Sequence, residues 1–264
     1  MDINTSNICN LLSLKLLAEY YCIGYSELQY YYNELANDKT FINELNQKID
    51  TCRDLYSKGL FLNKNITSID WFGNQRITLY VLVRFLKPET CVETGVFYGG
   101  STAFILNALE KNHKGKLISI DLPANKVQKA ISRHENVGNT ELVPKGLHTG
   151  FIIPDYLKDK WELIEDDSLN ALKELECPFS FFSHDSEHSR SFMIKELELA
   201  KTLMSNNATI FADDINWSNG FYEFCVNHKL YPLLLTDNGK DELKARLGVV
   251  RFDHPNNGKV DITG

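Results

Sequence analysis

The stretch VETGVFYGGS, which runs from Val92 to Ser101, carries the strongest indication of the fold. It closes an apolar run typical of a strand and opens an amphipathic segment typical of a helix. Its glycines allow the backbone to pass close to a ligand, and the first turn of a helix offers free N–H groups to a carboxylate or phosphate. The spacing E-x-G-x-x-x-G-x-S is neither the G-x-G-x-x-G of dinucleotide sites nor a P-loop, which requires Gly-Lys-Ser/Thr. We therefore predict a ligand-binding turn; a glycine-rich turn without a ligand is the alternative.

Short apolar runs alternate with helical segments on both sides of this stretch. Strands are expected over residues 91–94, 117–121, 161–164, 179–183, 209–212, 231–235 and 247–251. Strands that alternate with helices indicate βαβ units, a parallel sheet and helices on both of its faces. Ligands of such sheets bind at the carboxyl ends of the strands, near the point where the strand order reverses. Residues 122–160 are longer than one connecting helix requires, and we expect an insertion there over the active-site face.

Residues 1–70 differ from the rest of the chain and are expected to form a helical extension, with residues 71–264 as the main domain. Apolar side chains from Ile8 to Tyr20 recur at helical spacing, and Gly24 and Gly59 are the only glycines of the segment. The many tyrosines of this region pack the helices onto the main domain, or else line a pocket or an oligomer contact. We expect a homo-oligomer, because most soluble oligomers are symmetric assemblies of one chain.

The composition excludes several classes of protein. The chain has 264 residues, of which 43% are hydrophobic and 24% charged, which is ordinary for a globular protein. Lys and Arg total 28 against 35 Asp and Glu, and this acidic balance argues against a nucleic-acid partner. The longest apolar run contains Arg84 and is too short to span a membrane. The six cysteines form no C-x-x-C pair and the N-terminus does not resemble a signal peptide, so we expect a cytoplasmic protein.

Acidic side chains follow three of the expected strands. Asp121 ends the strand after the glycine-rich turn, where a carboxylate can accept both hydroxyls of a ribose. The sequence FFSHDSEH places Asp185 between two histidines, and IFADDIN places Asp213 beside Asp214. Adjacent carboxylates repel unless a cation lies between them. Three hard oxygen donors suit Mg²⁺ or another hard divalent ion, whereas capping of helix ends by these side chains is the alternative.

These motifs, taken in order, resemble those of class I S-adenosylmethionine (SAM)-dependent methyltransferases. The similarity is strongest to the metal-dependent O-methyltransferases, and within them to the branch that methylates macrolide sugars. It covers about residues 75–252 and includes the sequence FIIPDYLKDKW from Phe151 to Trp161. The resemblance implies a Rossmann-like, mostly parallel sheet whose last strand is antiparallel. It also implies two cofactors, SAM and Mg²⁺ or Mn²⁺.

The same resemblance implies a role for individual residues. The methionine end of SAM would be held by Glu93, Gly95, Phe97 and Ser101. The ribose would be held by Asp121, and the adenine would lie by Asp167 and Ser168. The metal ligands would be Asp185, Asp213 and Asp214. His188 would be the catalytic base, with His184 as the other candidate base or as a cofactor contact.

Two departures from the family pattern affect this reading. Ser205-Asn206-Asn207 stands where the family usually has a Gly-Gly turn, and Asn tolerates the left-handed conformation that we expect there. Asp166 precedes the adenine-side Asp167, where relatives often have Gly.

The expected reaction is metal-assisted transfer of a methyl group from SAM to a hydroxyl of a sugar, glycan or natural product. A phenolic or catechol acceptor is the first alternative. An NAD-dependent oxidoreductase and a non-catalytic partner subunit of the same fold are the others, and the oxidoreductase would need the missing G-x-G-x-x-G turn.

Overall fold

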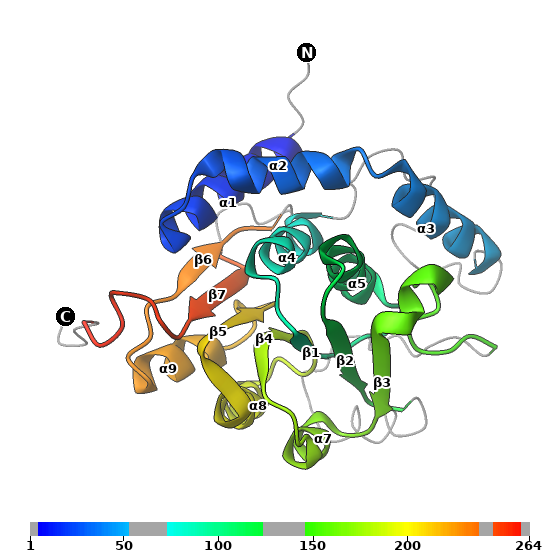
Figure 1. The fold of residues 1–264 in the computed structure, drawn as a ribbon. Helices are drawn as coiled ribbons and strands as arrows, with labels where there is room; N and C mark the ends of the chain where they lie inside the picture. The colour runs from blue at the N-terminus through cyan, green and yellow to red at the C-terminus, as the bar shows by residue number, and fades with distance from the viewer. Residues whose placement is uncertain (1–4, 53–72, 124–145, 238–244, 260–264) are drawn as a thin grey trace.

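The fold was analysed in a computed structural model that describes residues 5–52, 73–123, 146–237 and 245–259. Figure 1 shows a single sheet with helices on both faces. Seven strands pair in the order β3-β2-β1-β4-β5-β7-β6. The strands are β1 Thr90–Thr94, β2 Lys116–Asp121, β3 Trp161–Glu165, β4 Phe179–His184, β5 Met204–Ala212, β6 Leu233–Leu235 and β7 Leu247–Arg251.

The sheet is mostly parallel, as the sequence predicted. Strands β1 to β5 pair in parallel, and β7 runs antiparallel to both β5 and β6. The order of the strands reverses between β1 and β4, which therefore lie side by side at the centre of the sheet. In sheets of this kind, ligands bind outside the carboxyl ends of the strands that flank such a reversal.

Alternation along each strand fixes which side chains face which layer. Cys91 and Phe181 pack into one apolar core, whereas their neighbours Val92 and Phe182 pack into another. Both sets are fully buried, which explains why these strands read as continuous apolar runs. The first layer contains α4 Gly73–Leu86 and α5 Gly100–Asn112; the second contains α7 Ser168–Glu174, α8 Arg190–Leu203 and α9 Gly220–Asn227.

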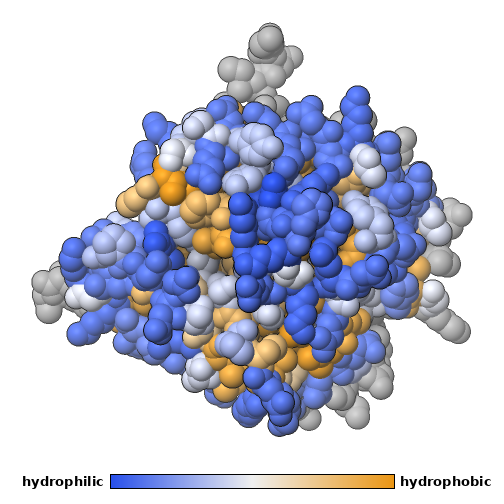
Figure 2. Space-filling model, viewed as in Figure 1, coloured by the Kyte–Doolittle hydropathy of each residue, from blue (hydrophilic) through white to orange (hydrophobic). Residues whose placement is uncertain are grey.

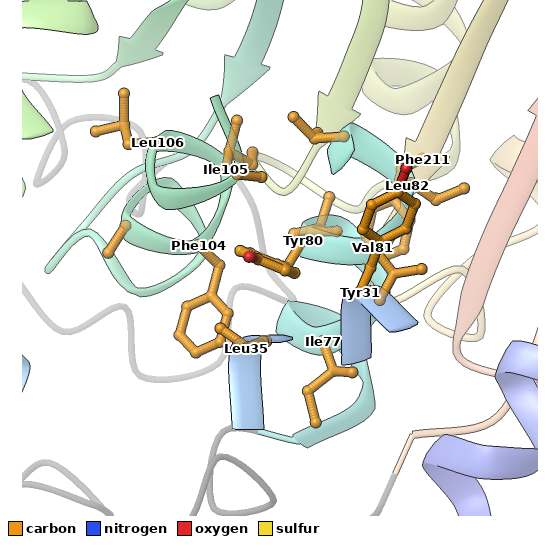
Figure 3. Packing of buried hydrophobic residues seen from close by; sticks show 14 of the residues in the cluster. Tyr31, Leu35, Ile77, Tyr80, Val81, Leu82, Phe104, Ile105, Leu106 and Phe211 are labelled. Atoms are coloured by element: carbon orange, nitrogen blue, oxygen red, sulfur yellow. The ribbon is translucent and has the colours of Figure 1, made fainter. Parts of the chain in front are cut away.

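Three further helices form an outer layer over α4 and α5 (Figure 1). They are α1 Thr5–Tyr21, α2 Tyr25–Ala36 and α3 Lys39–Cys52. Between this outer layer and the one below it, Tyr31 and Leu35 of α2 pack in one apolar cluster with Tyr80 of α4 and Phe104 of α5 (Figure 3). The helical prediction for the N-terminal region is thus confirmed over residues 5–52, and residues 53–70 lie outside the described part.

An ion pair strengthens the attachment of these outer helices. Arg84 of α4 donates from Nε to Glu34 Oε1 of α2 at 2.6 Å and from Nη2 to Glu34 Oε2 at 2.9 Å. Tyr80 Oη donates to the same carboxylate at 2.7 Å. The side chain of Arg84 is 9% exposed and that of Glu34 is 22% exposed, so this pair is largely shielded from solvent.

The tyrosines of the N-terminal region divide between core and surface. Four of them, Tyr20, Tyr21, Tyr31 and Tyr32, are buried in the core, which confirms the packing role for these rings. Tyr30 is 63% exposed. Hydrophilic side chains cover most of the face shown in Figure 2, and smaller hydrophobic areas reach the surface between them.

One expectation about local structure is wrong, and another falls mostly on residues that the structure does not describe. Asn206 and Asn207 do not adopt the expected left-handed turn: they belong to β5, and their φ angles are not positive. The pairing of β5 with β4 shifts register between Phe179 and Phe181, so an irregularity in the ladder replaces the turn. The insertion expected over 122–160 falls mostly on residues outside the described part, and its last residues form the 3₁₀ helix η2, Asp155–Lys160.

Candidate active site

The predicted site residues gather where β1, β4 and β5 end. Asp185 donates its backbone N–H to Thr94 O at 2.9 Å, and Asp213 donates its own to His184 O at 2.9 Å. These bonds extend the strand ladders by one residue each. They bring the turn after β1, the loop after β4 and the two aspartates after β5 to the same point beside the reversal of strand order.

Gly95 shows how closely these loops approach one another. Its φ is +85°, and a Cβ atom at this position would lie 2.0 Å from the carbonyl oxygen of Asp185. Only glycine fits there, because both the space and the left-handed backbone exclude a side chain. Phe97, two residues on, also has a positive φ of 51°, which is rare for a bulky residue. Such strain is typical of functional turns.

Asp121 fixes the far side of the same turn. Its Oδ2 accepts the backbone N–H of Phe97 at 2.8 Å, and its Oδ1 accepts that of Leu122 at 2.9 Å. Burial raises the pKa of Asp121, and the backbone donors partly counteract this effect. Each carboxylate oxygen can accept a further hydrogen bond. The side chain can therefore brace the turn and still accept the hydroxyls of a ribose.

Glu93 is a buried carboxyl group in β1, two residues before Gly95. It is 1% exposed, and its Oε2 accepts the hydroxyl of Ser119 at 2.6 Å. Its Oε1 is buried and has no hydrogen-bond partner among the described residues. Burial raises the pKa of Glu93 to about 7. An acid of this kind is poised to ionise when a cationic group approaches.

The three predicted metal carboxylates come together and are tied by residues that sequence reasoning missed. Gln75 Nε2, near the start of α4, donates to Asp185 Oδ2 at 3.1 Å and to Asp213 Oδ2 at 2.7 Å. Arg246 Nε donates to Asp214 Oδ1 at 2.6 Å. Neither Gln75 nor Arg246 stands in a motif, and both lie far along the chain from the aspartates they contact.

The electrostatics of this cluster favour an additional positive charge. Burial, and then the charge of Asp214, raise the pKa of Asp185 to about 7. Burial and both neighbouring carboxylates also raise the pKa of Asp213 well above its ordinary value. Asp213 Oδ1 is buried and accepts no hydrogen bond from the described residues, and Arg246 Nε lies 3.9 Å from it. The charges of Arg76 and Arg246 lower the pKa values of Asp185 and Asp213, respectively, but both values stay raised, so the three carboxylates remain under-neutralised.

A divalent cation fits the chemistry of this donor set. Hard carboxylate oxygens are the ligands that Mg²⁺ and Mn²⁺ prefer. Within the described residues, however, no three His, Cys, Asp or Glu side chains are arranged as a ready-made ion site. The aspartates are instead held by Gln75 and Arg246, so the metal stays a prediction that the donor chemistry supports.

His188 lies beside the carboxylates. Its Nε2 is 3.9 Å from Asp185 Oδ1 and 3.9 Å from Asp214 Oδ2. Burial, followed by the neighbouring His184, lowers the pKa of His188 to about 3, so the ring is neutral at neutral pH. On its other side, the exposed ring of Trp217 lies 5.3 Å away between centroids. A neutral imidazole in this position can accept a proton from a group held near the aspartates.

The remaining predicted residues are linked to a buried glutamate. Asp167 caps α7 by accepting the backbone N–H of Leu169 at 3.0 Å. Ser168 and His184 both hydrogen-bond to Glu196 of α8. Sequence reasoning missed Glu196, although a signal was present. It lies on the helix face formed by Met193, Leu197 and Ala200, where a charged residue is unexpected.

Comparisons with known proteins show what the chain is similar to. Residues 92–215 match the sequence model of a family described as a methyltransferase domain. The O-methyltransferase from Bacillus cereus, solved with SAH, is 17% identical, with a TM-score of 0.54 over 84% of this chain and 96% of that one. TomG from Streptomyces achromogenes, an O-methyltransferase involved in tomaymycin synthesis and solved with SAM, is 14% identical, with a TM-score of 0.54 over 84% and 94%.

No curated protein matches the chain in sequence. The fold is nevertheless the one found in solved class I O-methyltransferases, as predicted, and residues 92–215 are similar to a methyltransferase domain. No helix in the described part of the chain is long and apolar enough to cross a membrane.

Proposed function

We propose that this protein is a SAM-dependent O-methyltransferase that methylates a hydroxyl of a sugar, glycan or natural product with the help of a divalent cation. The observation that carries the proposal is the meeting of His188 and three carboxylates with the glycine-rich turn. The turn would hold SAM, because the solved relatives of the same fold bind SAM or SAH. The macrolide-sugar resemblance supports a sugar as the acceptor.

Each group of the site would have one task in this reaction. The glycine-rich turn would hold SAM, which when bound would supply its methyl group to the acceptor oxygen, take the electron pair of the broken carbon–sulfur bond onto sulfur and leave as SAH. The proton of the hydroxyl passes to Nε2 of His188. Asp185, Asp213 and Asp214 would hold the cation, which when bound lowers the pKa of a coordinated hydroxyl and fixes its direction. The rest of the rate acceleration would come from holding the acceptor oxygen close to the methyl carbon of SAM and in line with it.

Two further parts of the proposal concern the setting of the enzyme. All six cysteines are free thiols, which supports the expectation of a reducing, cytoplasmic location. The acceptor is expected to be a small molecule or glycan rather than a nucleic acid, because the net charge is −7. We also keep a homo-oligomer as the expected assembly.

Calorimetry with SAH and a methyl-transfer assay on a panel of sugars and phenols test the function. The chain should bind SAH, and Asp121→Ala should weaken binding about 10- to 100-fold by removing a charge-assisted acceptor. His188→Ala should lower turnover roughly 10²–10⁴-fold, and EDTA should abolish it until Mg²⁺ or Mn²⁺ is restored. Full activity in EDTA would refute metal assistance, and a wild-type chain without affinity for SAH would refute the function itself.

A further inference from the structure

Glu196 is a carboxylate that lies entirely inside the protein. It is 0% exposed and stands on the apolar face of α8, between the sheet and α7. A carboxylate in such surroundings is costly unless several donors surround it. His184 is its ion-pair partner among the described residues. A structural role in stability alone would be served as well by an apolar side chain of similar volume.

The donors to Glu196 come from three separate segments. Thr94 Oγ1, at the end of β1, donates at 2.8 Å. Ser186 Oγ, in the loop after β4, lies 2.9 Å from Oε1 and 3.1 Å from Oε2. Ser168, the first residue of α7, donates to Oε1, and His184 Nδ1 bonds to Oε2. One carboxylate therefore joins the ends of β1 and β4 to the start of α7.

These segments carry the two halves of the proposed site, which are the cofactor turn and the carboxylate cluster. Thr94 directly precedes Gly95, the tightest point of the cofactor turn. His184 and Ser186 flank Asp185 of the carboxylate cluster, whereas α7 begins on the predicted adenine side. A shift of Glu196 would therefore change how the cofactor half and the metal half are placed relative to each other.

The contact with Glu196 also defines the state of His184. Its Nδ1 bonds to Glu196, while its buried Nε2 has no hydrogen-bond partner among the described residues. The ring stands edge-on to His188, with 5.5 Å between centroids. Glu196 thus holds His184 beside His188, and His188 is the histidine that lies near the aspartates.

We propose that Glu196 is a positioning residue of this methyltransferase: through Thr94, His184, Ser186 and Ser168 it aligns the cofactor turn with the carboxylate cluster. His184 is then part of this support and not the base. The inference rests on the proposed function. It assigns to α8 a task beyond packing, and it makes cofactor affinity depend on a residue that does not itself contact the cofactor.

The test compares Glu196→Gln with Glu198→Gln in the full chain. Glu198 lies on the same helix and also pairs with a histidine, since its Oε1 is 2.7 Å from His228 Nε2, but this pair is outside the site. Glu196→Gln should weaken SAH binding about tenfold by calorimetry, and Glu198→Gln should bind like the wild type. The ¹⁵N shifts of His184 should show a protonated Nδ1 in the wild type and an altered pattern in Glu196→Gln only.

Wild-type SAH affinity in a folded Glu196→Gln variant would overturn the proposal. Should that variant fail to fold, Thr94→Val provides the same test, because it removes one donor without changing the shape of the side chain. It should weaken SAH binding about threefold, and an unchanged affinity would overturn the proposal equally. If the wild type binds no SAH, the proposed function fails, whereas the ¹⁵N shifts still decide whether Glu196 controls His184.

Discussion

Glu93 offers the most direct measurement of the electrostatics of this site. Its carboxyl group is buried at 1% exposure, and burial raises its pKa from 4.5 to about 7. Below pH 4.5 the group is protonated in both the folded and the unfolded chain, so it has no effect on the pH dependence of stability. As the pH rises from 4.5 to 7, the unfolded chain releases the proton and the folded chain keeps it. The folded state therefore loses stability over this window.

The size of the effect follows from the shift in the pKa. A difference of about 2.5 pKa units, at 1.36 kcal/mol for each unit, corresponds to about 3 kcal/mol lost by pH 8. Glu93→Gln removes the titration while keeping the acceptor for Ser119. The free energy of unfolding of this variant, relative to the wild type, should thus rise by about 2.5 kcal/mol between pH 5 and pH 8, since a small part of the loss has already occurred at pH 5. Any constant cost of burying the new amide cancels in this difference.

Urea unfolding at a series of pH values measures this difference without the cofactor. Glu162→Gln on β3 is the matched control, because its carboxylate is 56% exposed, and its curve should stay parallel to that of the wild type. Parallel curves for Glu93→Gln and the wild type would refute the reasoning. If Glu93 holds the methionine end of the cofactor, as the family resemblance implies, its ionised form attracts the cationic amino group of that end. SAH affinity should then rise with pH through about 7 in the wild type and less in the variant.

Three other measurements test the structure. Gly95→Ala should destabilise the fold by about 2 kcal/mol or more in thermal unfolding. The effect should exceed that of Gly258→Ala, because Gly258 has a similar φ of +80° but no atom of the described residues within 4 Å of its Cβ position; equal effects would contradict the close approach of Gly95 to Asp185. Glu34→Gln should cost about 3 kcal/mol by leaving Arg84 unpaired, and a value near zero would contradict the docking of α2. Light scattering at micromolar concentration should show a dimer or larger assembly, and a monomer would contradict the expected homo-oligomer.

Local sequence determined the strands and the position of each motif. Phe181 and Phe182 face opposite layers that are both buried, so the run to which they belong is apolar throughout and is recognisable without a structure. Asp121, Asp185 and Asp213 could be assigned to one edge of the sheet because each directly follows such a run. Parallel strands end at the same edge, so chain order alone predicts that these carboxylates approach one another.

Tertiary structure decided everything that depends on distant segments. Gln75 lies 110 residues from Asp185 and 138 from Asp213, and the start of α4 carries no motif that predicts its contact with either. Asn206 lies within β5 although Asn is a frequent turn residue, because the flanking residues Met204 and Thr209 pair with β4 and the chain between them passes through a register shift instead of a turn. Glu196 is unexpected on the apolar face of its helix, and only the tertiary structure shows that four donors from three segments surround it. Periodicity reports which face of a helix is buried, but it does not report what lies opposite, and the chemistry of this site depends on those opposing groups.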